Sequence, residues 1–196
     1  LAEGVPWVLN GQSPNFLYRA PMVSQLKTLL RNIDLSDDLG FRFSDRSWNE
    51  WPLTPEKFAA WLRDAPGDVV NLFLDYETIG EHQWKDSGVF DFWEKLPAAV
   101  LDEDVKWVTP SEVVDLFRAS QEYDCHWPTS WADAERDLSA WMGNVMQQEA
   151  IAKIHNLEEE VLAAKEPDLT HAWAKMQTSD HFYWMSTKGG TDGSVH

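Results

Sequence analysis

A nearly continuous apolar run over residues 69–74, Val-Val-Asn-Leu-Phe-Leu, restricts the fold more than any other feature of the sequence. The run has the length of a strand, and apolar side chains on both faces are typical of a strand buried in a parallel sheet. Helical patterns flank it at residues 54–66 and 88–101, and a second short apolar segment follows at residues 105–108. Strands that alternate with helices predict βα units in a parallel sheet or barrel.

Two short signals predict where helices begin. Residues 54–56, Thr-Pro-Glu, supply an N-cap, a proline at the first helical position and an acid in the first turn. Residues 109–112, Thr-Pro-Ser-Glu, form a capping box, which predicts a helix as far as about Ser120. The leucines of residues 23–32 favour a further helix, and residues 40–43 favour a short strand or strand-like loop.

The character of the sequence changes after residue 126. Helical patterns occupy residues 131–164, with a break near Gly143-Asn144, and residues 167–185. We therefore predict two parts: residues 1–126 as a partial (β/α) barrel and residues 127–196 as a helical region that is truncated at its C-terminus. The first residue is Leu1 rather than Met, and the sequence ends in a glycine-rich stretch, so we expect a piece of a larger protein.

Composition narrows the classes of partner. The formal net charge is −17, from 33 acidic and 16 basic residues, which argues against nucleic acid or an anionic membrane as a partner. Solubility alone is the alternative explanation for this acidity. The single cysteine, Cys125, excludes an intrachain disulfide, and no signal peptide is evident, so we expect a cytoplasmic protein. No apolar run is long enough to span a bilayer.

The twelve tryptophans are unusually many for 196 residues. Because an indole buries a large area, we expect about two thirds of them in the core. The remainder would be available for a binding cleft, where indole faces stack on the C–H faces of sugar rings. No HExxH or paired Cys/His spacing occurs, so we expect neither a metal nor an organic cofactor.

Four ionisable residues follow the apolar run directly: Asp75, Glu77, Glu81 and His82, with Trp84 beside them. Functional groups gather at the carboxyl ends of strands in βα folds, and acid–base chemistry needs carboxyl groups on a rigid element. Glu77 shares a face with Asp75 if the extended conformation continues. The alternative is an ordinary turn followed by an acidic helix N-terminus.

The amino-acid sequences of four segments resemble those of a known enzyme family. Residues 75–82, Asp-Tyr-Glu-Thr-Ile-Gly-Glu-His, are similar to a signature of glycoside hydrolase family 57, in its α-amylase-type branch. Residues 36–52 resemble an upstream stretch of these proteins. Residues 177–185, Gln-Thr-Ser-Asp-His-Phe-Tyr-Trp-Met, resemble their last signature, which lies in the helical region, and residues 131–147 resemble that region too. The resemblance covers essentially the whole chain.

The resemblance implies a fold, a reaction and a set of site residues. The fold is the C-terminal part of an incomplete (β/α)7 barrel followed by a helical bundle. The reaction is retaining hydrolysis of α-1,4-glucans such as starch, glycogen and maltooligosaccharides, in which a glutamate nucleophile and an aspartate acid/base stand about 5–5.5 Å apart. Asp75 matches the acid/base, and its pKa would have to be raised for the first step.

No segment of residues 1–70 resembles the nucleophile region, so we expect that glutamate upstream of Leu1 and the isolated chain to be inactive. Glu77 would orient a catalytic group. His82 would hydrogen-bond a sugar hydroxyl or a catalytic carboxylate, or cap the following helix. Glu81, Trp84, Asp180 and His181 would bind substrate or support those groups.

Three alternative functions stay open. A 4-α-glucanotransferase or a branching enzyme of the same family differs only in whether a sugar hydroxyl rather than water attacks the intermediate. A glucan-binding relative that has lost one catalytic carboxylate would retain the fold without the activity. The oligomeric state is not predicted by the sequence.

Overall fold

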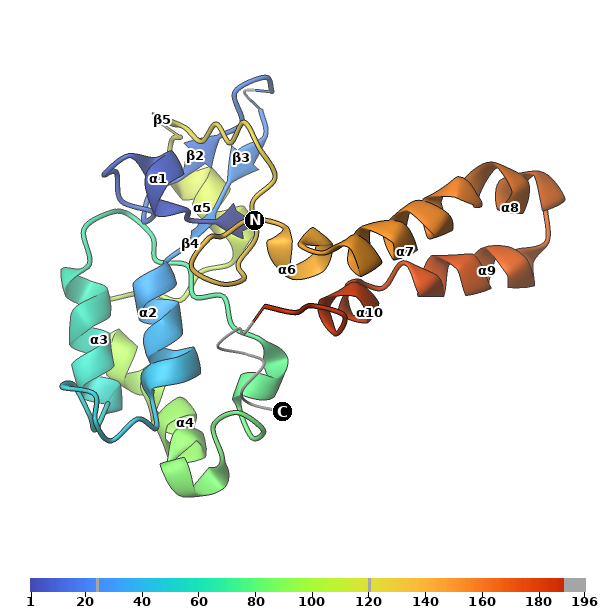
Figure 1. Cartoon of the computed structure of the whole chain (residues 1–196). Coiled ribbons are helices and arrows are strands. Elements are labelled where there is room, and N and C mark those ends of the chain that lie inside the picture. The colour runs from blue at the N-terminus through green and yellow to red at the C-terminus, as the bar shows by residue number, and fades with distance from the viewer. Residues whose placement is uncertain (24, 120, 189–196) are drawn as a thin grey trace. The chain divides into compact units, whose positions relative to one another are not determined.

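The computed structural model describes residues 1–23, 25–119 and 121–188. Most of the glycine-rich end, residues 189–196, lies outside this range. The chain forms two compact units, Leu1–Cys125 and His126–His196 (Figure 1). Each unit has its own set of packed elements. The assignment of the first unit to a partial barrel remains a prediction.

The described residues of the first unit contain short strands, α-helices, one π-helix and two 3-10 helices. The strands are β1 (Ala2–Glu3), β2 (Tyr18–Arg19), β3 (Lys27–Thr28), β4 (Leu30–Arg31) and β5 (Gln121–Glu122). The α-helices are α1 (Pro6–Leu9), α2 (Ile33–Asp37), α3 (Pro55–Asp64), α4 (Val89–Asp102) and α5 (Pro110–Leu116). The π-helix η1 spans Asp38–Arg42, and the 3-10 helices are η2 (Tyr76–Thr78) and η3 (Lys85–Ser87).

The described residues of the second unit are helical and contain α6 (Ser139–Met142), α7 (Val145–Asn156), α8 (Glu158–Ala164), α9 (Pro167–Met176) and α10 (Ser179–Tyr183). The predicted break near residues 143–144 is confirmed. Asn144 caps α7 through a capping box with Gln147. Residues 131–138 are not helical, and the single helix predicted over residues 167–185 is two helices, because α9 ends at Met176.

Two small sheets hold the strands of the first unit. β1 pairs in parallel with β4, in the register Ala2↔Leu30 and Glu3↔Arg31. β2 lies between β3 and β5, antiparallel to the former and parallel to the latter. Within the described residues these sheets do not close into a barrel. The unit has many helices and few strands.

The helix predicted over residues 23–32 is wrong, because this segment forms β3 and β4. Its leucines point to opposite sides, as strand residues do. Leu30 packs with Leu9 and Tyr18, whereas Leu29 packs with Leu17 in a separate cluster. Burial against two different cores therefore overrides the helical spacing.

The strand predicted at residues 40–43 is also wrong, because residues 38–42 form the π-helix η1. Leu39 and Phe43 are both buried in the main core and are four residues apart, which is the spacing of one helix face. Arg42 donates to Asp38 at 2.6 Å across one turn of this helix.

The predicted strand over residues 69–74 is extended but forms no regular ladder. Asn32 N–H donates to the Asn71 carbonyl at 2.9 Å, as a parallel neighbour would. The next hydrogen bond goes elsewhere, because Asn32 also caps α2 and so ends β4. Phe73 N–H donates to the Ser36 hydroxyl at 3.2 Å instead. A single backbone bond, to the residue that follows β4, is too little for a strand.

Residues 105–108, the second predicted strand, are not a strand either. Residues 69–73 and 105–108 both line one groove of about 540 Å³, together with side chains of α4 and α5. Among the described residues, the backbone hydrogen bond of residues 105–108 runs from Val105 N–H to the Val100 carbonyl near the end of α4. The groove therefore occupies the place of the expected pairing.

The helix signals of this unit are confirmed. Thr54 accepts a hydrogen bond from Lys57 N–H at 3.2 Å and caps α3. Thr109 and Glu112 form the reciprocal capping box of α5. The helix predicted over residues 88–101 is α4. α5 ends at Leu116, earlier than predicted, and Ser120 lies outside the described residues.

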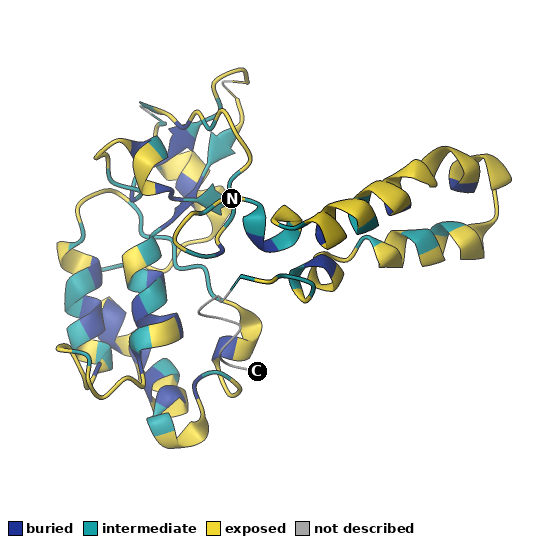
Figure 2. Ribbon diagram, viewed as in Figure 1, coloured by how far each residue is buried: buried dark blue, intermediate teal, exposed yellow. Residues whose placement is uncertain are grey.

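The main core lies where α3 and α4 pack against η1 and residues 69–74. Phe58 and Leu96 are fully buried at its centre. In the second unit, α7, α8 and α9 are largely exposed, with isolated buried side chains such as Ile154 and Val161 (Figure 2). None of the helices in the described ranges has the length and apolar character that crossing a membrane requires.

The prediction that most tryptophans are core residues is wrong. All twelve belong to the described residues, and none of them is fully buried. Five are half-buried, and seven are exposed: Trp7, Trp51, Trp84, Trp107, Trp127, Trp131 and Trp184. The cores of both units are built mainly from leucine, valine, alanine and phenylalanine. The indoles therefore lie at their margins.

Candidate active site

Three neighbouring segments, β1, β4 and residues 69–74, form one edge of the first unit. β1 ends at Glu3, which pairs in register with Arg31 at the end of β4. Residues 69–74 follow β4 on its other side and lead into Asp75. Arg31 Nε–H donates to the Phe73 carbonyl at 2.9 Å, two residues before Asp75. Glu3 and Arg31 thus lie side by side, and the Arg31 side chain joins them to the segment that leads into Asp75.

Arg31 is the buried cation of this edge, with only 7% of its surface exposed. One terminal nitrogen donates to Glu3 at 2.9 Å and the other to Asp37 at 2.5 Å. A guanidinium has a planar array of donors, so it can satisfy both carboxylates and a carbonyl at once. The Glu3 side chain is 8% exposed, and the opposite charge at this distance favours its ionised form.

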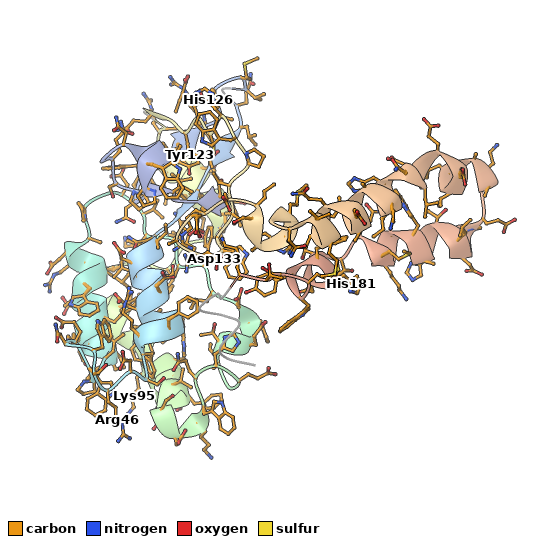
Figure 3. All side chains as sticks on the ribbon, in the orientation of Figure 1. Arg46, Lys95, Tyr123, His126, Asp133 and His181 are labelled. Atoms are coloured by element: carbon orange, nitrogen blue, oxygen red, sulfur yellow. The ribbon has the colours of Figure 1, made fainter. Side chains whose placement is uncertain are left out.

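Tyr123, labelled in Figure 3, holds the backbone around Glu3 through hydrogen bonds. Its hydroxyl donates to the Glu3 carbonyl at 2.7 Å and accepts from Val5 N–H at 3.2 Å. Burial raises the pKa of Tyr123 above its ordinary value of 10.0. The ring packs edge-on against Tyr18, whose pKa burial also raises. Glu3 is therefore fixed through both its main chain and its side chain.

Asp75 stands at the start of an ordered loop, residues 75–84. Its backbone is extended, with φ −68° and ψ 144°, and its carbonyl accepts from Thr78 N–H at 3.1 Å. The loop then turns through η2 and returns, because Gln83 N–H donates to the Thr78 carbonyl at 2.9 Å. Asp75 and Tyr76 are exposed, whereas Thr78 and Gln83 are buried.

Glu77 does not share a face with Asp75, because the extended conformation stops where η2 begins. Its carbonyl accepts from the N–H groups of Glu81 and His82, both at 3.1 Å, so its main chain braces the loop. The side chains of Glu77 and Glu81 are exposed.

His82 is half-buried. Of its two predicted roles, the capping of the next helix is wrong, whereas the hydrogen bond to a sugar hydroxyl or a catalytic carboxylate stays a prediction. Trp84 occupies the N-cap of η3 and Gly88 that of α4. Trp84 is itself 69% exposed, so its indole face is available to a ligand.

Asp180 and His181 belong to the second unit, on the short helix α10, and both are exposed (Figure 3). α10 is held by Gln147, a fully buried residue of α7. The Gln147 amide donates to the Phe182 carbonyl at 2.9 Å and to the Ala140 carbonyl at 2.7 Å. Asn144 donates to the Met185 carbonyl at 2.9 Å. One capping box thus also fixes the segment that bears Asp180 and His181.

Burial raises the pKa of Asp38, and the nearby Arg42 opposes this shift. The pair lies on η1. Among the described residues, no group of three or more His, Cys, Asp or Glu side chains is arranged to hold a metal ion.

Sequence reasoning missed Glu3, Arg31, Tyr123 and Gln83 as residues of this site. Glu3 lies in a two-residue strand without a motif of its own, and its partner Arg31 was assigned to a helix. Gln83 directly follows the recognisable motif of residues 75–82, but a glutamine at that position has no distinctive chemistry. Only the pairing of β1 with β4 reveals Glu3.

Comparison with known proteins supports the likeness seen in the motifs. The profile described as "Glycosyl hydrolase family 57" matches residues 1–126. The chain is 42% identical over 205 aligned positions to a protein of Methanocaldococcus jannaschii described as "Putative alpha-amylase"; the match covers 99% of the chain and 44% of that protein. The chain therefore spans less than half the length of this curated relative. No solved structure matches it. On the extent of both matches, the chain belongs to glycoside hydrolase family 57.

Proposed function

We propose that the protein containing these residues is a retaining α-glucan hydrolase of the α-amylase type, with Asp75 as its general acid/base. Family membership and the description of the archaeal relative support a glycosidase. The position of Asp75 supports its role, because it follows an extended segment beside β4 and opens an ordered, exposed loop. An acid/base must reach the glycosidic oxygen from a rigid support, and this arrangement provides one.

The observation that supports this proposal best is a second carboxylate, that of Glu3, which Arg31 links to the segment that leads into Asp75. Glu3 ends β1, Asp75 follows residues 69–74, and β4 with Arg31 lies between them. We propose Glu3 as a nucleophile within the chain. The expectation that the nucleophile precedes Leu1 stays a prediction, and a nucleophilic Glu3 is the alternative to it. A nucleophile must be ionised, which the ion pair with Arg31 favours.

The two carboxyl groups would divide the reaction into two displacements. In the first, a Glu3 oxygen forms a bond to the anomeric carbon while the bond to the leaving oxygen breaks, and Asp75 gives that oxygen its proton. In the second, the Asp75 carboxylate takes a proton from water as the water oxygen displaces Glu3. Two inversions restore the original configuration and return both groups to their starting states.

Several exposed residues are proposed to bind the glucan rather than to transform it. Trp84 offers an indole face, and Glu77, Glu81 and His82 offer polar groups on the same loop. Asp180 and His181 of the second unit are proposed for substrate binding as well. Stacking on a ring and hydrogen bonds at its rim suit a sugar, which has apolar faces and polar edges.

The test uses the 196-residue chain and the full-length protein side by side. A 5-fluoroglucosyl fluoride accumulates the covalent intermediate of a retaining α-glucosidase, and mass spectrometry of the digested protein identifies the labelled residue. Label on Glu3 supports the in-chain nucleophile. Label on a glutamate that precedes Leu1 sinks it and leaves Asp75 as the acid/base.

Activity measurements separate the roles. Asp75→Asn should reduce amylose hydrolysis by at least about a thousandfold while the glucan still binds. Glu3→Gln should do the same. Asp37→Asn is the matched control, because it also removes a carboxylate from Arg31 but leaves Glu3 intact. Equal losses of amylose hydrolysis in Glu3→Gln and Asp37→Asn would mean that Glu3 acts only as a structural partner of Arg31.

Product analysis on amylose then distinguishes hydrolysis from transfer. Glucans longer than the starting material would show that a sugar hydroxyl accepts the glycosyl group, as in a glucanotransferase. Binding without any product, in a protein with both carboxylates intact, would contradict the enzymatic proposal.

A further inference from the structure

Gln83 is a buried polar side chain at the end of the loop that bears Asp75, and it is only 3% exposed. Its amide nitrogen donates to the Gly40 carbonyl at 2.7 Å, across 43 positions of sequence. Its amide oxygen is buried without a hydrogen-bond partner among the described residues. A buried amide with one unsatisfied end is costly, so the bond that its other end makes needs a reason.

Gly40 lies against the residues at both ends of the loop, Leu74 before it and Gln83 near its end. It lies in the π-helix η1, a type of turn that is frequent at functional sites. A side chain at Gly40 would place its Cβ 3.6 Å from Leu74, the residue before Asp75. Leu74 thus packs over Gly40 while Gln83 bonds to its carbonyl. The loop between them is fastened at one point of η1.

Gln83 also ties the loop to Asp75 through the main chain. Its N–H donates to the Thr78 carbonyl at 2.9 Å, and Thr78 N–H donates to the Asp75 carbonyl at 3.1 Å. Gly80 N–H donates back to the Gln83 carbonyl at 3.0 Å. A continuous path of hydrogen bonds therefore runs from η1 through Gln83 and Thr78 to the backbone of Asp75.

Most side chains of residues 75–83 are exposed. Tyr76, Glu77, Ile79 and Glu81 are exposed, and Thr78 is the other buried residue between Asp75 and Gln83. Gly80, with φ +114°, allows the chain to pass Phe90 closely. The loop bonds to itself, but its buried polar link to η1 is the Gln83 amide.

We propose that Gln83 is a positioning residue, whose bond to the Gly40 carbonyl holds the Asp75 loop against η1 in the orientation that acid/base catalysis requires. This rests on the proposed role of Asp75. Gln83 does not contact the reacting atoms in this scheme. It acts by keeping the Asp75 backbone from rotating away as the carboxyl gives up and regains its proton.

A variant of the same shape tests this. In Gln83→Glu the protonated carboxyl can donate to the Gly40 carbonyl as the amide does, whereas the ionised carboxylate faces that carbonyl with no donor. The loop should therefore be held at low pH and released as pH rises. Gln83→Leu lacks the donor at every pH, and the wild-type amide keeps it at every pH.

The first measurement is hydrogen exchange of the amides of residues 76–83 in the 196-residue chain, relative to wild type at the same pH. Gln83→Leu should exchange at least tenfold faster at pH 5 and pH 8. Gln83→Glu should exchange more slowly than Gln83→Leu at pH 5 and match it at pH 8, reversibly. Reversal within one variant excludes misfolding as the cause. Exchange at the wild-type rate in Gln83→Leu would overturn the anchor.

The second measurement is amylose hydrolysis by the full-length protein. Gln83→Leu should lower kcat at least tenfold with KM changed less than threefold, and the kcat ratio of Gln83→Glu to wild type should fall between pH 5 and pH 8. A pH-independent ratio, with loop exchange altered as above, would overturn positioning but keep the anchor. If Asp75→Asn leaves activity unchanged, the acid/base assignment fails, and the exchange results still decide the anchor.

Discussion

Arg31 donates from Nε to the carbonyl oxygen of Phe73 at 2.9 Å, and this one bond joins a paired strand to the segment that leads to Asp75. The same guanidinium binds Glu3 and Asp37. The edge proposed for catalysis therefore depends on one buried cation for its assembly.

Replacing Arg31 by methionine should destabilise the first unit by about 3–5 kcal/mol, because it leaves buried carboxylates without their counter-charge. Urea unfolding of the 196-residue chain, followed by circular dichroism, measures this. Arg19→Met is the matched control. Its ion pair with Glu122 has side chains 39% and 46% exposed, so its loss should change the unfolding free energy by less than about 1 kcal/mol. Similar losses in both variants would contradict the role given to Arg31.

Gln147→Leu should loosen α10, since two carbonyls lose their buried donor at a cost of about 1–3 kcal/mol each. We expect faster amide exchange in residues 179–185 than in α9. Gln148→Leu tests the specificity of the effect, because Gln148 is the next residue on α7 but makes an exposed hydrogen bond to Met142. If Gln148→Leu loosened α10 as much, the buried amide would not be the cause.

The first unit should lose stability in alkali. Burial raises the pKa of Tyr18 and Tyr123 above 10.0, so the folded state keeps protons that the unfolded state releases. Their contribution is complete below pH 10 and is lost as pH rises through the folded pKa values. Tyr123→Phe should flatten this decline in the unfolding free energy between pH 9 and pH 11. An unchanged slope would mean that other groups dominate the alkaline transition.

Asp38 should give a signal of the same sign, but at acid pH. Burial raises its pKa above the ordinary 3.8, so the folded state binds the proton more tightly than the unfolded chain does. Its contribution to stability is complete below 3.8 and falls as pH rises through the folded pKa. Asp38→Asn should therefore gain stability relative to wild type between pH 3 and pH 6. A relative loss would show that the bond to Arg42 outweighs burial.

Local signals in the sequence were reliable where the structure they specify is local. Thr54 and Thr109 cap their helices because an N-cap and a capping box involve residues three positions apart. The acidic segment at Asp75 was recognisable for the same reason, since its loop bonds largely to itself. Its motif also identified the family before any fold was considered.

What sequence reasoning missed depended on distant partners. Residues 23–32 have leucines at helical spacing, but β1 and β2 supply strand partners that no local pattern reveals. Residues 69–74 are apolar enough for a strand, yet Asn32 ends β4 to cap α2. Glu3 gains meaning only through Arg31, 28 positions away. Burial of one residue by another cannot be deduced until the fold places them together.

The position of the indoles has a spectroscopic consequence. Because none of the twelve tryptophans is fully buried, the emission of this chain should lie near that of solvated indole and be quenched readily by acrylamide. Any molecule that covers Trp7, Trp84 or Trp107, whether a glucan or another stretch of polypeptide, should shift that emission to the blue. The chain thus has a built-in optical reporter of whatever binds to its surface.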